Sequence, residues 1–277
     1  MGNLGLMREG SEDPNMTIEN FRGFHATRVA ENIIFLDEIG STNTYAKDLI
    51  KNGAPAGTAI IAAKQTAGRG RLGRSWDGDG ENIYMSVILS PSRYEAGSAA
   101  QLTLMAGLCV TNVLSRTLLK TSHKVFIKWP NDIVVDRKKI CGILTEGVMD
   151  AVVIGIGINI GRKSFPVELI DKGTSLYMLT KREHDRAEII KCVLTELSSY
   201  YERFEAQGIS SFIDEYKALC LNIGKKVTIH ENDASYEAMC LDVTDGGELY
   251  VELSGGERQM LNSGEVSVKG IYGSDEQ

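Results

Sequence analysis

The segment at residues 151–160, AVVIGIGINI, constrains the fold more than any other because it is apolar almost throughout. A short run of this kind is typical of a strand buried on both faces of a sheet. It also holds Gly155 and Gly157, and glycine weakens a strand unless another group approaches it closely. We therefore predict a covered, central strand. Asn159 is polar among apolar neighbours, so it needs partners, either in a ligand or in an adjoining loop.

Short apolar runs and helical patterns alternate through residues 31–222. Ser41 is a candidate helix N-cap, and Gly53 is the matching stop signal. Apolar runs on either side of the turn residues 136–138 predict a hairpin. Because hairpins and helices are mixed, we predict an α+β body, not a doubly wound sheet. Residues 1–30 are expected to be an N-terminal tail. Further strands are expected at 33–36, 58–64, 82–89 and 125–128, and further helices at 99–119, 187–204 and 209–221.

The pattern changes at Asn222-Ile223-Gly224. Short strand-like runs follow, separated by the turn signals Asp245-Gly246-Gly247 and Ser254-Gly255-Gly256. Short strands at such close spacing suggest a small β-barrel. We therefore assign residues 223–272 to a separate C-terminal β domain.

Composition excludes several classes of function. The net charge of −7 disfavours general nucleic-acid binding, which depends on neutralising phosphates. No apolar run is long enough to span a membrane, and the N-terminus lacks the pattern of a secretory signal. The cysteines form no C-x-x-C pair, so they indicate buried thiols in a reducing cytosol rather than a zinc site or disulfides. They are Cys109, Cys141, Cys192, Cys220 and Cys240.

The segment 68–76, GRGRLGRSW, carries the strongest chemical signal. It formally matches G-x-G-x-x-G, but the following residues cannot open a helix as a dinucleotide-binding fingerprint requires. Its glycines allow backbone amides to approach a ligand, and its arginines suit carboxylates and phosphates. The segment therefore indicates an anion-binding loop, although a solvated basic hairpin remains the plainer alternative. An RNA-binding Arg-Gly tract is disfavoured because the tract is single and the protein is acidic.

Two further segments place polar groups beside apolar strands. In Lys128-Trp129-Pro130-Asn131-Asp132, the last two residues occupy a turn between strands. They could bind a polar ligand or a metal-bound phosphate, or serve only the turn. Lys139 enters an apolar strand, where it could pair with a carboxylate and a phosphate together, or lie at a solvated hairpin tip.

Taken together, these segments resemble the biotin protein ligases over about residues 33–270. The order and the spacing of the motifs both agree with that family. The motifs are Ser41-Thr42-Asn43, Gln65-Thr66-Ala67 with the 68–76 loop, Lys128-Trp129-Pro130-Asn131-Asp132, Lys139-Ile140-Cys141-Gly142-Ile143-Leu144, and Gly155-Ile156-Gly157-Ile158-Asn159.

The resemblance implies a fold and a reaction. The fold would be of the class II synthetase type, a mixed sheet with helices on one side, followed by an SH3-like β-barrel. The reaction would join biotin to ATP as biotinyl-5′-adenylate and then transfer biotin to a lysine of a biotin carboxyl carrier protein. Mg²⁺ would accompany ATP, and the enzyme would be cytoplasmic.

The resemblance also implies roles for individual residues. Lys139 and Arg71 would be the catalytic cations, since attack of one anion on another is slow unless cations share the charge. Asp132 would help to hold magnesium with the phosphates. Biotin would be bound by Ser41, Thr42, Gln65, Gly68, Arg69, Arg71, Lys139 and Gly142, and ATP by Arg71, Arg74, Trp76, Asn131, Lys139 and Asn159.

Three alternatives accompany this interpretation. A lipoate or octanoate transferase or ligase has a related fold but would lack the Gly-Arg-Gly-Arg loop. A biotin-responsive regulator would need a DNA-binding helix-turn-helix, and residues 1–30 show no such pattern. A non-catalytic biotin-binding module would need neither Lys139 nor the basic loop. We therefore expect a monofunctional ligase without specific DNA or membrane binding, and homodimer formation is left open.

Overall fold

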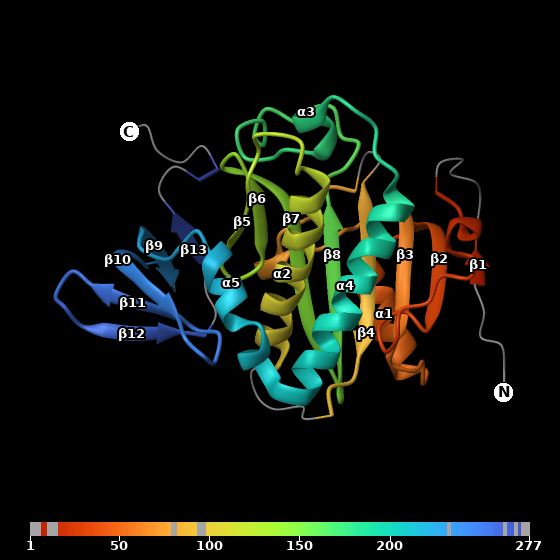
Figure 1. The fold of residues 1–277 in the computed structure, drawn as a ribbon, viewed down its shortest axis with the longest axis horizontal. Coiled ribbons are helices and arrows are strands. Elements are labelled where there is room, and N and C mark those ends of the chain that lie inside the picture. Colours follow the sequence, from red (N-terminus) through yellow and green to blue (C-terminus); the bar gives the residue numbers. More distant parts are fainter. Residues whose placement is uncertain are drawn as a thin grey trace.

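The main body is built on one mixed sheet. The computed structural model describes residues 7–9, 16–78, 82–92, 98–231, 234–262, 265–268 and 271–272. Its eight-stranded sheet has the order β1-β2-β3-β4-β8-β7-β6-β5 (Figure 1). The strands are β1 (Met7–Glu9), β2 (Asn32–Ile39), β3 (Thr58–Gln65), β4 (Ile83–Leu89), β5 (Val125–Lys128), β6 (Asp132–Val135), β7 (Lys138–Val148) and β8 (Ala151–Ile158).

The strand β8 lies inside this sheet, between β4 and β7, so the prediction of a central strand is confirmed. Only β1–β2 and β2–β3 pair in parallel, and the other neighbours are antiparallel. Side chains alternate between the two faces of a strand. On β8, Ile154 and Ile156 enter the larger hydrophobic core, while Val153 enters a second core on the other face. Gly155 and Gly157 share the face of Val153.

Helices cover both faces of the sheet, and this corrects one part of the prediction. On one face lie α2 (Ser98–Thr117), α4 (Arg186–Gln207) and α5 (Ile213–Leu219) (Figure 1). Helix α1 (Thr42–Lys51) packs on the opposite face, where Ala46 and Ile50 meet the second core. It begins at the predicted cap, since the Ser41 hydroxyl accepts a hydrogen bond from the Thr44 N–H. The apolar side chains of α1 are buried against this second face, because α2 and its neighbours cover the first.

Three segments differ from expectation. Residues 16–30 are no loose tail, because Met16, Phe21 and Val29 are fully buried in the larger core around the short helix η1 (Ile18–Phe21). The hairpin turn is shorter than predicted: Asp136 and Arg137 both adopt positive φ, so Lys138 already belongs to β7. The helix expected at 209–221 is divided into η3 (Gly208–Ser211) and α5. The remaining helix is α3 (Leu176–Thr180).

The C-terminal region forms the predicted small β domain. Its strands make a five-stranded antiparallel sheet in the order β12-β11-β10-β9-β13. Gly247, with φ of 95°, brings a turn of this domain against Leu104 of α2. The indole N–H of the buried Trp129 donates to the Gly247 carbonyl at 3.1 Å, which ties the two sheets together. The strands are β9 (Lys226–Glu231), β10 (Ala234–Val243), β11 (Leu249–Leu253), β12 (Arg258–Leu261) and β13 (Glu265–Val268).

Trp129→Phe tests this contact between the domains. The substitution removes the hydrogen bond to Gly247 and leaves part of a packed site empty. We expect the free energy of unfolding to fall by about 2 kcal/mol and the melting temperature to fall by several degrees. The measurement is chemical and thermal unfolding. Phe126→Leu in strand β5 is the control, because the Phe126 side chain is partly exposed. An unchanged unfolding curve for Trp129→Phe would show that the contact contributes nothing.

Candidate active site

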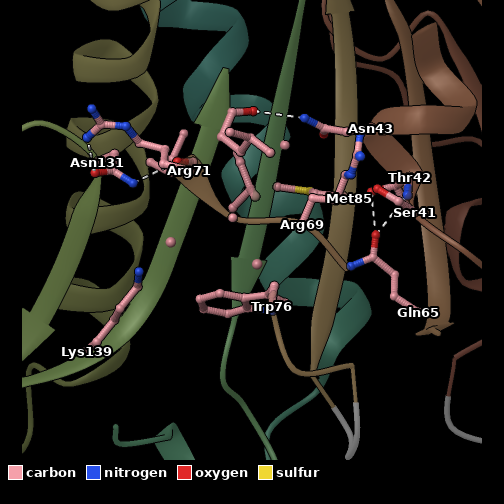
Figure 2. Close-up of a pocket in the computed structure, with 17 residues that line it drawn as sticks. Ser41, Thr42, Asn43, Gln65, Arg69, Arg71, Trp76, Met85, Asn131 and Lys139 are labelled. Carbon is pink, nitrogen blue, oxygen red and sulfur yellow. Dashed lines mark hydrogen bonds between the residues drawn. The ribbon is translucent and has the colours of Figure 1, made fainter. Parts of the chain in front are cut away.

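A patch of bare backbone lies on the face of the sheet that carries α1. Gly142 of β7 is paired in register with Gly157 of β8. The indole ring of Trp76 lies over both (Figure 2). A Cβ atom on Gly142 would come within 2.8 Å of that ring, and one on Gly157 within 2.6 Å. The close approach predicted for the strand glycines is therefore made by Trp76 itself.

The basic loop before Trp76 is folded back on itself. The Gly70 N–H donates to the Arg74 carbonyl at 2.7 Å, and the Trp76 N–H donates to the Gly68 carbonyl at 2.9 Å. Gly68 cannot be replaced cheaply, since a Cβ atom there would lie 2.5 Å from the Trp76 carbonyl oxygen. The loop thus delivers Trp76 to the glycine patch by backbone hydrogen bonds.

A neutral polar corner lies beside the patch, where α1 begins (Figure 2). The side-chain oxygen Oε1 of Gln65 accepts hydrogen bonds from the Thr42 N–H at 2.8 Å and from the Thr42 hydroxyl at 3.1 Å. These two donors fix the orientation of the Gln65 amide, so its NH₂ group is left to donate elsewhere. Ser41 and Arg69 line the same cavity. The corner offers donors and acceptors at fixed positions for a neutral polar group.

Asn43 forms the floor of this corner. Its side-chain NH₂ group donates to the Leu144 carbonyl and to Glu146, and its carbonyl oxygen accepts from Ser86 at 2.6 Å. It fills the space above Gly155, where any side chain would overlap with it. Glu146 also pairs with Lys47 at 2.7 Å. Burial opposes ionisation of Glu146, but Lys47 and Asn43 outweigh it and hold the pKa of the carboxyl below its usual value.

Asn131 connects the basic loop to the sheet. Its side-chain oxygen accepts from Arg71 at 2.9 Å, and its NH₂ group donates to the Ile143 carbonyl at 3.0 Å. The Ile143 N–H returns a bond to the Asn131 carbonyl. Asn131 therefore holds the Arg71 guanidinium beside the mouth of the cavity, which is more than a turn residue serving the backbone would do.

Lys139 and Asp132 form an ion pair at 2.6 Å. The Lys139 ammonium also lies 5.3 Å from the centre of the Trp76 ring, within range of a cation–π interaction. Burial opposes ionisation of Asp132, but Lys139 and Lys128 outweigh it and lower the pKa of the carboxyl. Lys139 is thus no solvated hairpin tip.

A second cavity of about 250 Å³ opens beyond Lys139. Its wall includes the basic side chains of Arg74, Arg162 and Lys172 and two carboxylates, of which Asp77 pairs with Arg162 at 2.5 Å. Trp76 and Lys139 line both this cavity and the first one. The site therefore has two arms that share Lys139: the first we call the neutral arm, after its Ser41–Thr42–Gln65 corner, although Arg69 and Arg71 also line it, and the second we call the basic arm.

The first arm is too small for a ligand as it stands. Its volume is about 50 Å³, whereas ligand pockets usually measure about 300–1,000 Å³. Trp76 lies across it, and the indole N–H is buried without a hydrogen-bond partner in the structure. A buried donor of this kind is costly unless another group satisfies it. We infer that Trp76 and its loop move when the arm is filled.

The structure brings the predicted site residues together with one exception. Gly68 lines neither of these two cavities and instead packs against Trp76 and Gln65. Asn159 lines the second cavity, while its backbone N–H donates to the Ile140 carbonyl. Residues lining the first cavity are Ser41, Thr42, Gln65, Arg69, Arg71, Trp76, Asn131, Lys139 and Gly142; those lining the second are Arg74, Trp76, Asp132, Lys139 and Asn159.

Sequence reasoning missed other residues that line these cavities. Asn43 belongs to a family motif but had no predicted role in the site, and Arg162 follows a strand without any motif. Tyr272 lines the second cavity from the far end of the chain, so no spacing could link it to Lys139. Among the described residues, no cluster of three or more His, Cys, Asp or Glu side chains could hold a metal. No described helix combines the length and apolar character needed to cross a bilayer.

Comparisons with known proteins agree on one family. The model described as "Biotin/lipoate A/B protein ligase family" matches residues 35–161, and "Biotin protein ligase C terminal domain" matches residues 223–269. The bifunctional ligase/repressor BirA of Bacillus spizizenii is 33% identical over 249 residues, which cover 87% of this chain and 75% of that protein. The biotin--[acetyl-CoA-carboxylase] ligase of Mycobacterium tuberculosis is 30% identical, with 83% of this chain and 88% of that protein covered.

A solved structure has the same fold. The biotin protein ligase from Aquifex aeolicus in complex with biotin and ATP superposes with a TM-score of 0.76 at 31% sequence identity. The match covers 86% of this chain and 99% of that chain. It confirms the predicted fold class, with the exception of the helices on both faces.

Gly157→Ala tests the contact between Trp76 and the sheet. The new methyl group would lie within 2.6 Å of the ring, so we expect the ring to leave the patch. Because the other tryptophan, Trp129, is buried, a red shift of emission and stronger iodide quenching would report on Trp76. Gly107→Ala is the control, since its nearest neighbours are 3.8 Å away. Unchanged emission for Gly157→Ala would contradict the packing of the indole ring on the glycine patch.

Proposed function

The chain belongs to the biotin/lipoate A/B protein ligase family, and we propose how its two-armed site performs the family's reaction in this member. The protein is a biotin protein ligase, which activates biotin with ATP and transfers it to a carrier protein. The lipoate and octanoate alternative is not supported, because the relatives from Bacillus, Mycobacterium and Aquifex are biotin ligases. Each arm of the site can be matched to one of the two substrates.

We assign the neutral arm to biotin. The ureido group of biotin is uncharged and carries both donors and acceptors, which suits the corner formed by Ser41, Thr42 and Gln65. Gln65 supports this assignment because Thr42 occupies its carbonyl and leaves its NH₂ group free to donate. Gly142 leaves the sheet bare for close approach, and Arg69 lines the same arm. Gly68 contributes indirectly, because it lets the loop fold so that Trp76 reaches the glycine patch.

We assign the basic arm to the nucleotide. Arg74 brings positive charge to this cavity, as the phosphates require. Trp76 offers a flat aromatic face for the adenine ring, and its unpartnered N–H is free to donate to a ligand. Asn131 holds Arg71 where the loop can close over the acyl phosphate. Asn159 lines the same arm.

Lys139 carries the proposal, because it is shared by the two arms. The carboxylate of biotin must attack the α-phosphorus of ATP and displace pyrophosphate, and both reactants are anions. An ammonium between them offsets their repulsion and stabilises the charge that spreads in the transition state. Arg71 would share this work. Closure of the loop would then keep water from the acyl-adenylate until a carrier lysine attacks it.

Magnesium fits this site as an ion brought in by ATP. The described residues form no protein cage for a metal, yet Mg²⁺ commonly takes one or two carboxylates together with phosphate oxygens. Asp132 is the carboxylate that would meet it, at the edge of the basic arm. The ion would neutralise phosphate charge during the displacement of pyrophosphate.

The partner of the second step would be a biotin carboxyl carrier protein or domain. We also propose that the enzyme acts in the cytoplasm, where ATP is abundant, and its free cysteines are in keeping with a reducing compartment. We propose neither membrane binding nor specific DNA binding, and a homodimer remains an open alternative.

Mass spectrometry of a carrier domain tests the function directly. The protein is incubated with biotin, ATP, magnesium and the carrier domain. The carrier should gain the mass of biotin less one water, on one lysine, only when ATP is present. Octanoate or lipoate in place of biotin should give no gain. A carrier that accepts lipoate but not biotin would overturn the proposal.

Lys139→Ala tests the assignment of the catalytic cation. We expect pyrophosphate release to fall by about 10²–10³-fold, because the charge is needed most in the transition state. The fold should survive, as the side chain is partly exposed and fills no core. Lys139→Arg should restore only part of the rate, because a planar fork cannot take the same position between two anions. A folded Lys139→Ala that releases pyrophosphate at the parental rate would leave Arg71 as the cation.

A footprinting experiment tests for specific DNA binding. At about physiological salt, we expect no sequence-specific footprint on promoter DNA, because a net charge of −7 opposes binding to phosphates. A non-specific basic DNA-binding protein serves as the positive control. A specific footprint at less than about 100 nM protein would show a regulatory function in addition to the ligase.

A further inference from the structure

The chain returns to the active site at its C-terminal end. After β13, the Ile271 N–H donates to the Val268 carbonyl, and the Tyr272 N–H donates to the carbonyl of Arg137 in the β6–β7 turn at 3.0 Å. The second of these bonds joins the segment that follows the small domain to the catalytic sheet. It brings the side chain of Tyr272 to the wall of the basic arm, beside Asp132 and Lys139.

Tyr272 makes a short hydrogen bond inside the site. Its hydroxyl donates to Asp132 Oδ2 at 2.6 Å, while Lys139 pairs with the other oxygen, Oδ1, at the same distance. The Lys128 ammonium lies 4.9 Å from the centre of the Tyr272 ring. Each oxygen of the Asp132 carboxylate thus has its own partner. The carboxylate cannot rotate without breaking its contact with Tyr272 or with Lys139.

The backbone of Tyr272 is held in an unusual conformation. It adopts φ of 65°, which is unfavourable for a residue with a side chain. A chain end keeps such a conformation only where surrounding contacts hold it.

We propose that Tyr272 is a positioning residue for adenylate formation: by fixing Asp132 it fixes the Lys139 ammonium between the two arms. The inference rests on the proposed function of Lys139 and extends it to a residue that follows the last strand of the C-terminal domain. Without the hydroxyl, the Asp132 carboxylate could turn and draw Lys139 away from the path of attack. The small domain thus completes the phosphate side of the site.

Tyr272→Phe tests the proposal, since it removes the hydroxyl and keeps the ring over Lys128. We expect kcat/KM for ATP in pyrophosphate release to fall by about ten-fold, as for loss of a hydrogen bond to a charged group. Biotin affinity, measured by calorimetry without ATP, should not change, and neither should the melting temperature by more than a degree or two. Tyr236→Phe is the matched control, because its hydroxyl accepts a bond from Gln259 within the small domain.

A double substitution separates positioning from a general structural effect. If Tyr272 acts only through Asp132, then Tyr272→Phe should have no further effect in the Asp132→Ala protein. Asp132→Leu, which also lacks an acceptor, serves in the same way if Asp132→Ala does not fold. Full additivity, or an equal loss of biotin affinity and melting temperature in Tyr272→Phe, would overturn the proposal.

The remaining outcomes are also decisive. A parental rate for Tyr272→Phe together with a slow Lys139→Ala would refute the positioning role and leave the proposed function intact. A faster Tyr272→Phe would show that Tyr272 obstructs the arm, which is the opposite of positioning. A parental rate for Lys139→Ala would instead refute the assignment on which this inference rests.

Discussion

The bare strip of sheet at Gly142 and Gly157 is the constraint on which the site depends. Their cross-strand pairing leaves no side chain at these two positions, so Trp76 can lie directly on the backbone. The opposite face of β8 is fully packed with branched side chains against α2 and α4. The two faces of β8 therefore differ in what they do. One face stabilises the fold through packed side chains, whereas the glycines of the other face lack such packing and leave room for a ligand.

Electrostatics explains why the polar groups gather where this strip ends. Lys139 follows a tight turn and is succeeded in its strand by the apolar residues 140–144, so its charge needs a partner. Asp132 supplies it, one strand away and opposite Gly142. An ion pair in a partly buried site gains strength from the lower dielectric but loses hydration. A phosphate entering the basic arm would share the Lys139 ammonium with Asp132, whose other oxygen is bonded to Tyr272.

Much of this arrangement could be predicted from the sequence, and the reasons are local. Strand β8, the cap at Ser41 and the short strands of the C-terminal domain follow from side-chain periodicity and turn chemistry over a few residues. Most of the cavity residues followed instead from the resemblance of the motifs to a known family. Sequence could not reveal that α1 covers the second face, that residues 16–30 enter the core, or that Tyr272 reaches Asp132. Each of these is a contact between distant segments, and only the assembled sheet determines it.

The segment 128–132 explains why a catalytic domain of this kind would keep a small β domain attached. Its Trp129 donates to Gly247 in a turn of that domain, and its Asp132 accepts from Tyr272, which follows the domain's last strand. Between them, Asn131 holds Arg71 of the anion-binding loop. Within five residues of the chain, therefore, Trp129 contacts the small domain, Asn131 contacts the anion-binding loop, and Asp132 contacts both Lys139 and Tyr272. Any shift of the small domain must move Asp132 as well, so the docking of that domain sets the geometry of the charge pair.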